Sequence, residues 1–132
     1  MADWQKWREM ARESQTAAIV LEHEQLLRPS ASRFYYAAFQ ISTAVLLYLK
    51  LTPPLGEEGW SHASTPEILR DRLEPVLKSM DDRRKLARQL SELYKIRIEA
   101  DYISESTVDA KKSQESGRKA KYLVKKLEEI LP

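Results

Sequence analysis

Apolar residues recur along most of the chain at intervals of three and four, the spacing that places side chains on one face of an α-helix. The first such segment runs from Asp3 to about Glu24, with Asp3 as a candidate N-cap. Its apolar or small positions are Trp7, Met10, Ser14, Ala17 and Leu21. Pro29 interrupts the pattern, and proline is tolerated in the first turn of a helix. The pattern therefore predicts one amphipathic helix and the start of a second.

The second predicted helix, from about Ser30 to Lys50, is apolar on nearly every face. Such a helix is covered by neighbours on all sides in a globular protein. Its longest apolar stretch is shorter than the roughly 20 residues that span a bilayer. Three polar side chains also interrupt it, Gln40, Ser42 and Thr43. We therefore expect the central helix of a bundle, no membrane partner, and a loop over residues 51–61, which contain two prolines and two glycines.

A third helix begins shortly after this loop, and two start signals are possible for it. Ser64 and Glu67 have the spacing of a capping box. Alternatively, Thr65 is followed by Pro66 in a first turn, where the missing amide hydrogen does no harm. Pro75 lies too deep for the interior of the same helix, since its ring would clash with the preceding turn. The sequence therefore predicts a kink or a split at Pro75.

Two more amphipathic helices complete the chain. The fourth is predicted from Asp81, its candidate N-cap, to about Asp101, and its apolar stripe is Leu86, Leu90 and Leu93. The fifth runs to Leu131 after Ser106 and Asp109, which have the spacing of a start signal. Its stripe is Ser113, Gly117, Ala120, Val124, Leu127 and Leu131. Short connections predict an all-α, antiparallel up-and-down bundle of four to five helices in one domain spanning residues 1–132.

Composition and charge do not change the predicted fold, but they bear on partners and location. The net charge of +2 neither supports nor excludes an RNA partner, because domains that bind RNA through its phosphates are usually more basic. The chain has no cysteine, which excludes disulfides and thiolate metal sites and fits a reducing compartment. Its first residues lack the basic and then apolar layout of a signal peptide. We therefore expect a cytoplasmic protein.

Arg97 is the most informative residue for function. It follows Leu93 by four positions and so continues the apolar stripe of the fourth helix, where a guanidinium needs a partner or a wet cleft. Asp101 lies one turn later, in the weaker orientation for an ion pair and at a helix end whose dipole opposes a carboxylate. Two interpretations stay open beside simple surface exposure: a buried Arg97–Asp101 pair that packs the fourth helix, and a binding or catalytic site around Arg97.

Other polar residues add less. Tyr35 and Tyr36 lie in the densest apolar segment and need hydrogen-bond partners, for which Asp101 is a candidate. His23 is predicted to lie at the surface, and the role of His62 is open. Neither histidine has the spacing of a metal-ligand motif. Glycine-rich phosphate loops and serine nucleophile elbows are also missing. We therefore expect no metal and no cofactor.

Two segments carry a family resemblance. Residues 32–39 read Ser-Arg-Phe-Tyr-Tyr-Ala-Ala-Phe, and residues 97–102 read Arg-Ile-Glu-Ala-Asp-Tyr. Together with the order and spacing of the helices, they resemble a branch of small prokaryotic proteins of the HEPN superfamily with Tyr-Tyr-Ala and Arg-x-x-Ala-Asp-Tyr motifs. The resemblance covers most of the chain. It implies a helical bundle that forms a homodimer.

The resemblance also bears on catalysis. The active members it points to are metal-independent endoribonucleases, including toxins paired with small nucleotidyltransferase antitoxins. Their motif is an arginine followed by a histidine a few residues later. Arg97 matches the arginine, but Tyr102 stands where the histidine is expected, and no histidine follows. An imidazole with a pKa of about 6.5 exchanges protons at neutral pH, whereas a phenol with a pKa of about 10 is a poor base. The departure argues against catalysis.

We therefore predict a binding module for a nucleotide, an RNA or a protein partner such as a nucleotidyltransferase, as in a toxin–antitoxin pair. The candidate site residues are Arg97, Asp101, Tyr102, Tyr35 and Ser32. Two alternatives remain. The first is a metal-independent endoribonuclease toxin in which Arg97 stabilises transition-state charge and Tyr102 or Asp101 replaces the histidine. The second is a purely structural interaction protein in which Arg97 and Asp101 only pack.

Overall fold

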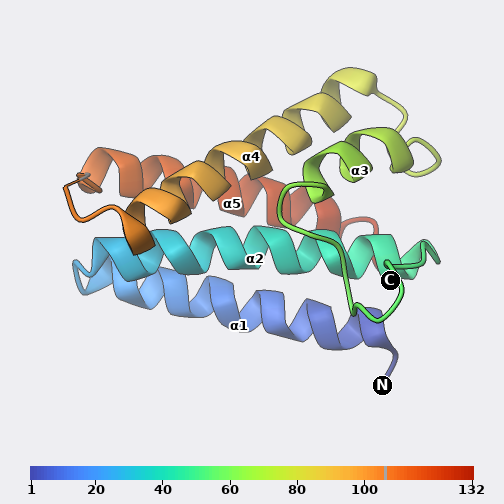
Figure 1. The fold of residues 1–132 in the computed structure, drawn as a ribbon, viewed down its shortest axis with the longest axis horizontal. Coiled ribbons are helices and arrows are strands. Elements are labelled where there is room, and N and C mark those ends of the chain that lie inside the picture. Colours follow the sequence, from blue (N-terminus) through green and yellow to red (C-terminus); the bar gives the residue numbers. More distant parts are fainter. Residues whose placement is uncertain (106) are drawn as a thin grey trace.

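The computed structural model describes residues 1–105 and 107–132, and within these ranges it contains helices and no strands. The helices are α1 (Asp3–His23), α2 (Leu27–Tyr48), α3 (Thr65–Arg72), α4 (Met80–Tyr102) and α5 (Ala110–Glu128). The four long helices alternate in direction along the bundle, and short α3 lies beside the first half of α4 (Figure 1). The predicted all-α bundle is confirmed.

Helix α2 is the centre of the bundle, as its apolar sequence predicts. It packs against each of the other four helices and is buried over most of its length. The side chains of Phe34, Tyr35 and Ile41 are fully buried, and burial of a large apolar side chain contributes roughly 1.5–3 kcal/mol. The same helix carries Ser32 and Tyr36, so the rigid core element also positions candidate site residues.

Small residues decide how closely the neighbours approach α2. The buried positions of α1 are Ala11, Ser14 and Ala18. Met10 was expected on the apolar face, but it lies beside this buried stripe and is 42% exposed. On α5 the predicted stripe is buried throughout the described positions. A Cβ atom at Gly117 would lie only 3.2 Å from Cζ of Phe34, so α5 approaches α2 as closely as glycine allows.

Two of the predicted N-caps are wrong by one or two positions. Asp3 is the first residue of α1, and the amide of Ala2 instead donates to Oε1 of Gln5 at 2.8 Å. Ser79, not Asp81, caps α4 by accepting a hydrogen bond from the amide of Asp82 at 3.2 Å. Acidic residues in a first turn still suit the helix dipole, which is why the sequence signal was ambiguous. The α5 start at Asp109 is confirmed, whereas the predicted role of Ser106 lies outside the described residues.

Prolines lie at the start of the short helix α3 and just after its end. Pro66 lies in its first turn, and the Ser64 side chain makes no capping bond to it, so the capping-box alternative is wrong. The Ser64 hydroxyl instead hydrogen-bonds the Ser61 hydroxyl at 2.7 Å. Helix α3 ends at Arg72, and the chain turns through Pro75 before α4. The predicted split at Pro75 is confirmed.

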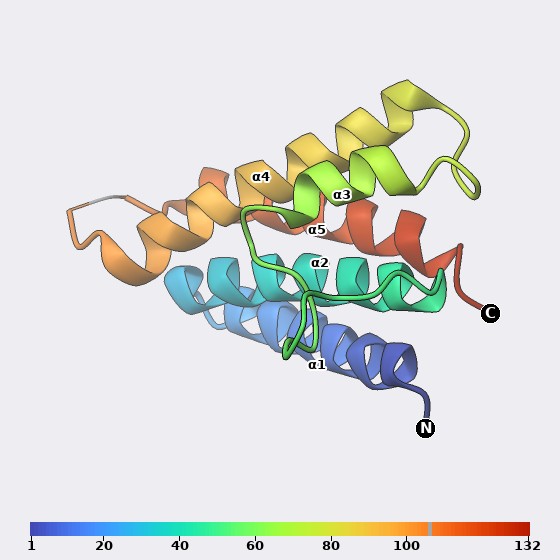
Figure 2. The same ribbon diagram turned by 45° about the vertical axis from the view of Figure 1, so that its right-hand side comes forward.

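A long loop between α2 and α3 returns across the bundle. Figure 2 shows it running back over α2 and reaching down to α1. The contact is close at Gly59, where a Cβ atom would lie 3.2 Å from Cγ2 of Thr43 and 3.8 Å from the Trp7 ring. This path carries His62 to the middle of α2, where its ring lies against Tyr35 and Phe39.

The two ends of the chain are joined by an ion-pair cluster. Glu128 near the end of α5 lies 2.7 Å from Nη2 of Arg8 and 3.2 Å from Nε of Arg12, both on α1. Burial alone would raise the pKa of Glu128, but these two arginines lower it below its usual value. No helix in residues 1–105 or 107–132 combines the length and hydropathy needed to cross a lipid bilayer.

Candidate functional site

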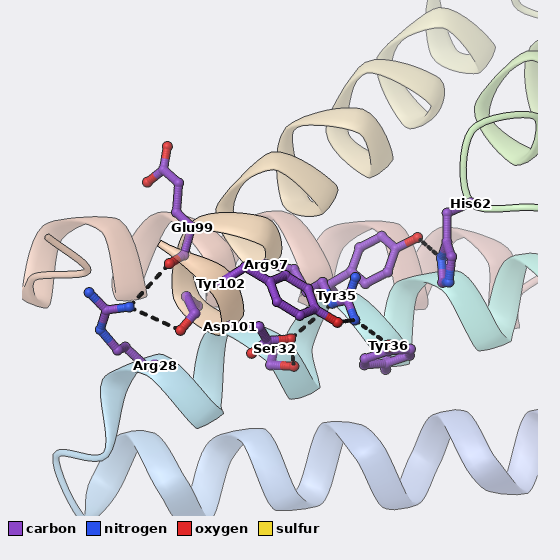
Figure 3. Close-up of polar contacts among 10 residues, drawn as sticks. Arg28, Ser32, Tyr35, Tyr36, His62, Arg97, Glu99, Asp101 and Tyr102 are labelled. Atoms are coloured by element: carbon purple, nitrogen blue, oxygen red, sulfur yellow. Dashed lines mark hydrogen bonds and ion pairs between the residues drawn. The ribbon is translucent and has the colours of Figure 1, made fainter. Parts of the chain in front are cut away.

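Arg97 lies near the end of α4 and faces α2, as its place on the apolar stripe predicts. Its side chain is 12% exposed, and Nε lies 2.9 Å from Oδ2 of Asp101. Nη2 donates to the hydroxyl of Tyr36 at 2.9 Å and to the hydroxyl of Tyr102 at 3.2 Å (Figure 3). Simple surface exposure is therefore excluded. The guanidinium is held by one carboxylate and two phenols.

The ion pair is close but incomplete. The Nε–H group of Arg97 does not point at the carboxylate oxygen and has no hydrogen-bond acceptor in the described residues. Oδ2 of Asp101 instead accepts a hydrogen bond from Oγ of Ser32 on α2 at 3.1 Å. Burial lowers the pKa of Arg97, but Tyr36, Tyr102 and Asp101 together raise it above its usual value. The guanidinium stays charged and keeps an unused donor.

Tyr36 is flanked by two cations. The guanidinium carbon of Arg33 lies 4.7 Å from the centre of the Tyr36 ring, and that of Arg97 lies 5.3 Å from it. Both distances are within the range of cation–π attraction. Arg33 has no ion-pair partner in residues 1–105 and 107–132. The cluster therefore holds two guanidinium groups and the single carboxylate of Asp101, which leaves an excess of positive charge.

Tyr35 does not lie where the sequence suggested. Successive helix residues point about 100° apart, so Tyr35 faces away from Asp101, and its hydroxyl contacts Nδ1 of His62 at 2.5 Å (Figure 3). The proposed Tyr35–Asp101 hydrogen bond is wrong, and it is Tyr36 that joins the Arg97 cluster. Burial raises the pKa of the Tyr35 phenol, so this hydroxyl stays protonated at neutral pH.

His62 lies in an aromatic setting beside this cluster. The centre of its ring is 4.4 Å from that of Phe39 and 5.5 Å from those of Tyr35 and Tyr94. Burial, followed by the charge of Arg97, lowers the pKa of His62 below the usual value. The neutral imidazole is thus the favoured form. His23, as predicted, is exposed at the end of α1.

Arg28 is a residue that sequence reasoning missed. Its Nη1 donates to the backbone carbonyl of Glu99 at 3.1 Å (Figure 3). The same atom donates to the carbonyls of Ala100 at 3.0 Å and Ile103 at 3.1 Å. A cation at these carbonyls offsets the negative end of the α4 dipole, which otherwise opposes a carboxylate at Asp101. No local signal could have revealed this contact, because Arg28 and its partners are more than 70 positions apart in the chain.

The cluster opens onto a hollow of about 560 Å³. Polar residues from α2 and the end of α4 line it, among them Arg28, Ser32, Arg33, Asp101 and Tyr102. The Tyr102 side chain is 68% exposed, so its ring is available at the rim. No three histidine or acidic side chains in the described part of the chain are placed to hold a metal ion. The hollow is suited to a small group that carries negative charge.

The comparison with known protein families agrees with this architecture. The HEPN domain model matches residues 4–131, nearly the whole chain, and the protein therefore belongs to the HEPN family. The resemblance seen in the sequence is confirmed at the level of the family. None of the curated proteins compared with the chain matches it.

Proposed function

We propose that this protein is a HEPN binding module whose Arg97 site holds a phosphate group of a nucleotide or of single-stranded RNA. The supporting observation is the pair of guanidinium groups near the Tyr36 ring, those of Arg33 and Arg97, with the carboxylate of Asp101 as the one ion-pair partner they have in the described residues. A phosphate placed beside them gains charge-assisted hydrogen bonds that water does not replace fully.

The free donor of Arg97 supports the same ligand chemistry. Its Nε–H has no acceptor among the described residues, although the atom itself is buried. Guanidinium groups bind phosphate through two parallel N–H donors. Asp101 and Tyr102 line the hollow and contact the Arg97 guanidinium, so a phosphate that reaches this donor displaces one of these two side chains. Asp101 and Ser32 then hold the guanidinium in place rather than contacting the ligand.

Tyr102 gives a reason to prefer a nucleotide or single-stranded RNA over a simple anion. Its exposed ring lies 5.1 Å from the Arg97 guanidinium carbon at the edge of the hollow. Unpaired bases stack on exposed aromatic rings beside arginines that hold the adjacent phosphate. Stacking of this kind contributes roughly 1–3 kcal/mol per base.

A metal-independent endoribonuclease using Arg97 is the second candidate function, and one observation favours it. Tyr102 replaces the histidine expected on α4, but the α2–α3 loop brings the centre of the His62 ring to 6.1 Å from that of Tyr36, whose hydroxyl accepts a hydrogen bond from Arg97. In this alternative, Arg97 stabilises the charge that develops on the phosphate, and His62, Tyr102 or Asp101 moves the proton.

Partners follow from the family. HEPN domains often form dimers and bind RNA, and we propose that this chain is a homodimer that also pairs with a nucleotidyltransferase-type protein, as in a toxin–antitoxin system. Light scattering at several concentrations tests the homodimer. A mass that stays at that of a single chain, 15.4 kDa, at every concentration would contradict it.

The test of the binding function uses fluorescence anisotropy with a short 5′-fluorescein-labelled oligouridylate, and ATP as competitor. We expect micromolar binding that Arg33→Gln and Arg97→Gln each weaken by about tenfold, as expected for loss of one charged phosphate contact. Arg118→Gln is the matched control, because Arg118 is an exposed arginine on α5 and the substitution changes the net charge equally. Binding that is absent, or that all three variants weaken alike, would contradict the proposal.

The same RNA separates binding from cleavage. If the protein only binds, the labelled strand stays intact with or without EDTA. Cleavage that resists EDTA and is lost in both Arg97→Gln and His62→Gln would support the endoribonuclease instead. Cleavage that EDTA abolishes would argue against both, because it indicates a metal-dependent contaminant or site.

A further inference from the structure

A second surface, separate from the Arg97 cluster apart from His62, is hollowed between α1, α2 and the α2–α3 loop. The hollow measures about 820 Å³. Its apolar lining includes Trp7, Phe39 and Trp60, and its polar lining includes His62, Glu57 and Glu58. No lysine or arginine lines it, although the chain contains 22 of them.

An adjoining hollow of about 390 Å³ shares Trp7, Glu57 and Glu58 with the first. It adds Asp3 and Met10 of α1, together with Lys6, which is 3.9 Å from the Asp3 carboxylate. The two hollows therefore adjoin at Trp7, Glu57 and Glu58. We call them together the loop groove. The loop groove has room for more than one side chain of a ligand, and the charged residues that line it carry a net negative charge.

The carboxylates of Glu57 and Glu58 are available to a ligand. Both residues are exposed, and neither forms an ion pair or a side-chain hydrogen bond within residues 1–105 and 107–132. His62 adds little positive charge, because burial and the nearby Arg97 lower the pKa of His62. The field in the loop groove is thus set by carboxylates that line it together with two partly buried tryptophan rings.

We propose that the loop groove binds a basic segment of a partner protein, with arginine or lysine side chains lying over Trp7 and Trp60 and paired with Glu57 and Glu58. A cation gains both from the face of an indole ring and from an adjacent carboxylate. A nucleic acid is the opposite case, because its phosphates would be repelled by the same carboxylates. The groove and the Arg97 site therefore select ligands of opposite charge.

The length and the rim of the groove favour a polypeptide over a small cation. Two adjoining hollows that share Glu57 and Glu58 have room for two basic side chains of one polypeptide. Leu55, at the tip of the loop beside Pro53 and Pro54, is fully exposed and offers an apolar contact next to the acidic residues.

The loop that forms the groove is anchored before any partner binds. The 3.2 Å approach of Gly59 to Thr43 and the 2.5 Å contact of His62 with Tyr35 fix it to α2 at two points. Trp60 packs against the main core cluster. A surface held in this way loses little conformational entropy on binding.

Tryptophan fluorescence tests the proposal directly. The probes are a short peptide of alternating arginine and glycine, a glutamate–glycine peptide of equal length, and spermine. We expect a saturable change with the basic peptide, weakened at least about tenfold by Glu57→Gln with Glu58→Gln, as expected for two lost charge contacts. The matched control is Glu9→Gln with Glu13→Gln, which removes two exposed carboxylates on the outer side of α1 and should leave binding unchanged.

Three outcomes would overturn the proposal. Basic-peptide binding could be absent, or it could fall equally in the control variant, which would indicate attraction to overall charge. Spermine could also bind as tightly as the peptide, which would identify a site for small cations. Circular dichroism of both glutamine variants checks the fold, and because all four positions are exposed we expect unchanged helix content. Arg97 does not line the loop groove, so failure of basic-peptide binding is distinguishable from failure of oligouridylate binding at the proposed phosphate site.

Discussion

Arg97 and Asp101 lie one turn apart on α4, with Nε only 2.9 Å from Oδ2, yet the pair does not satisfy either partner. The Nε–H of Arg97 has no hydrogen-bond acceptor in the described residues, and Asp101 takes its hydrogen bond from Ser32. A pair that served packing alone would bring its donors and acceptors together. This geometry is the basis for treating Arg97 as a binding residue.

The double variant Arg97→Met with Asp101→Leu separates packing from binding. Asp101→Leu alone leaves a largely buried guanidinium without its carboxylate and should lower the free energy of unfolding by about 2 kcal/mol. The double variant should recover most of that loss, since apolar groups of similar volume replace both charges. Urea unfolding measures stability, and anisotropy measures binding. If the double variant still bound the oligouridylate as the wild type does, the pair would be structural only.

Sequence patterns predicted the helices well because each depends on local spacing. The apolar stripe of α5 identified the buried face of that helix, and the prolines around α3 identified where it begins and ends. Both features depend on backbone geometry within a few residues. The caps at Ser79 and Ala2 were missed by one or two positions, because several polar residues near a helix start satisfy the same rule.

The site was predicted only in part. The Arg97–Asp101–Tyr102 segment follows from its place on one helix, and Ser32 joined it as expected. Arg28 and His62 could not be found in the same way, because each contacts residues far along the chain through the packing of other elements. Tyr36, and not Tyr35 as predicted, contacts the Arg97 cluster. Because α2 is apolar on nearly every face, its sequence does not show which of two neighbouring tyrosines points toward α4.

Glu128 provides a test of the contact between the chain ends. The two arginines lower the pKa of Glu128, so its contribution to stability is present above its usual pKa of 4.5 and is lost as the pH falls through the lowered value. Glu128→Gln should therefore lower the free energy of unfolding by about 1 kcal/mol at pH 7, with a smaller difference below pH 4.5. Chemical denaturation of both proteins across this range measures it. An equal difference at low pH would contradict the ion-pair account.

His62 should titrate at a lower pH in the folded chain than in the unfolded chain. Because burial and Arg97 lower the pKa of His62, the folded state favours the neutral ring, and stability falls as the pH drops below about 6.5, the value in an unfolded chain. NMR of a His23→Gln variant, with and without urea, measures the titration of His62 alone. In His62→Gln the stability loss over this range should be smaller. A folded value equal to the value in urea would contradict the packing described for the loop.

Gly117 tests the close approach of α5 to α2. Alanine gains about 1 kcal/mol over glycine in a helix, but its Cβ would lie 3.2 Å and 3.3 Å from two ring atoms of the fully buried Phe34. We expect Gly117→Ala to lower the free energy of unfolding by about 1 kcal/mol in total, because overpacking costs more than the propensity gain. Thermal unfolding measures it, and a higher melting temperature than that of the wild type would show that the two helices can move apart.

The most direct measurement is the NMR signal of the Arg97 Nε–H group during titration with the oligouridylate. A phosphate that binds to the free donor should shift and sharpen this resonance in a saturable way, together with that of Arg33, while the resonance of exposed Arg118 stays in place. If the signals of Arg33 and Arg97 remain unchanged while RNA binds and those of the arginines on other faces move instead, the phosphate site does not lie at Arg97.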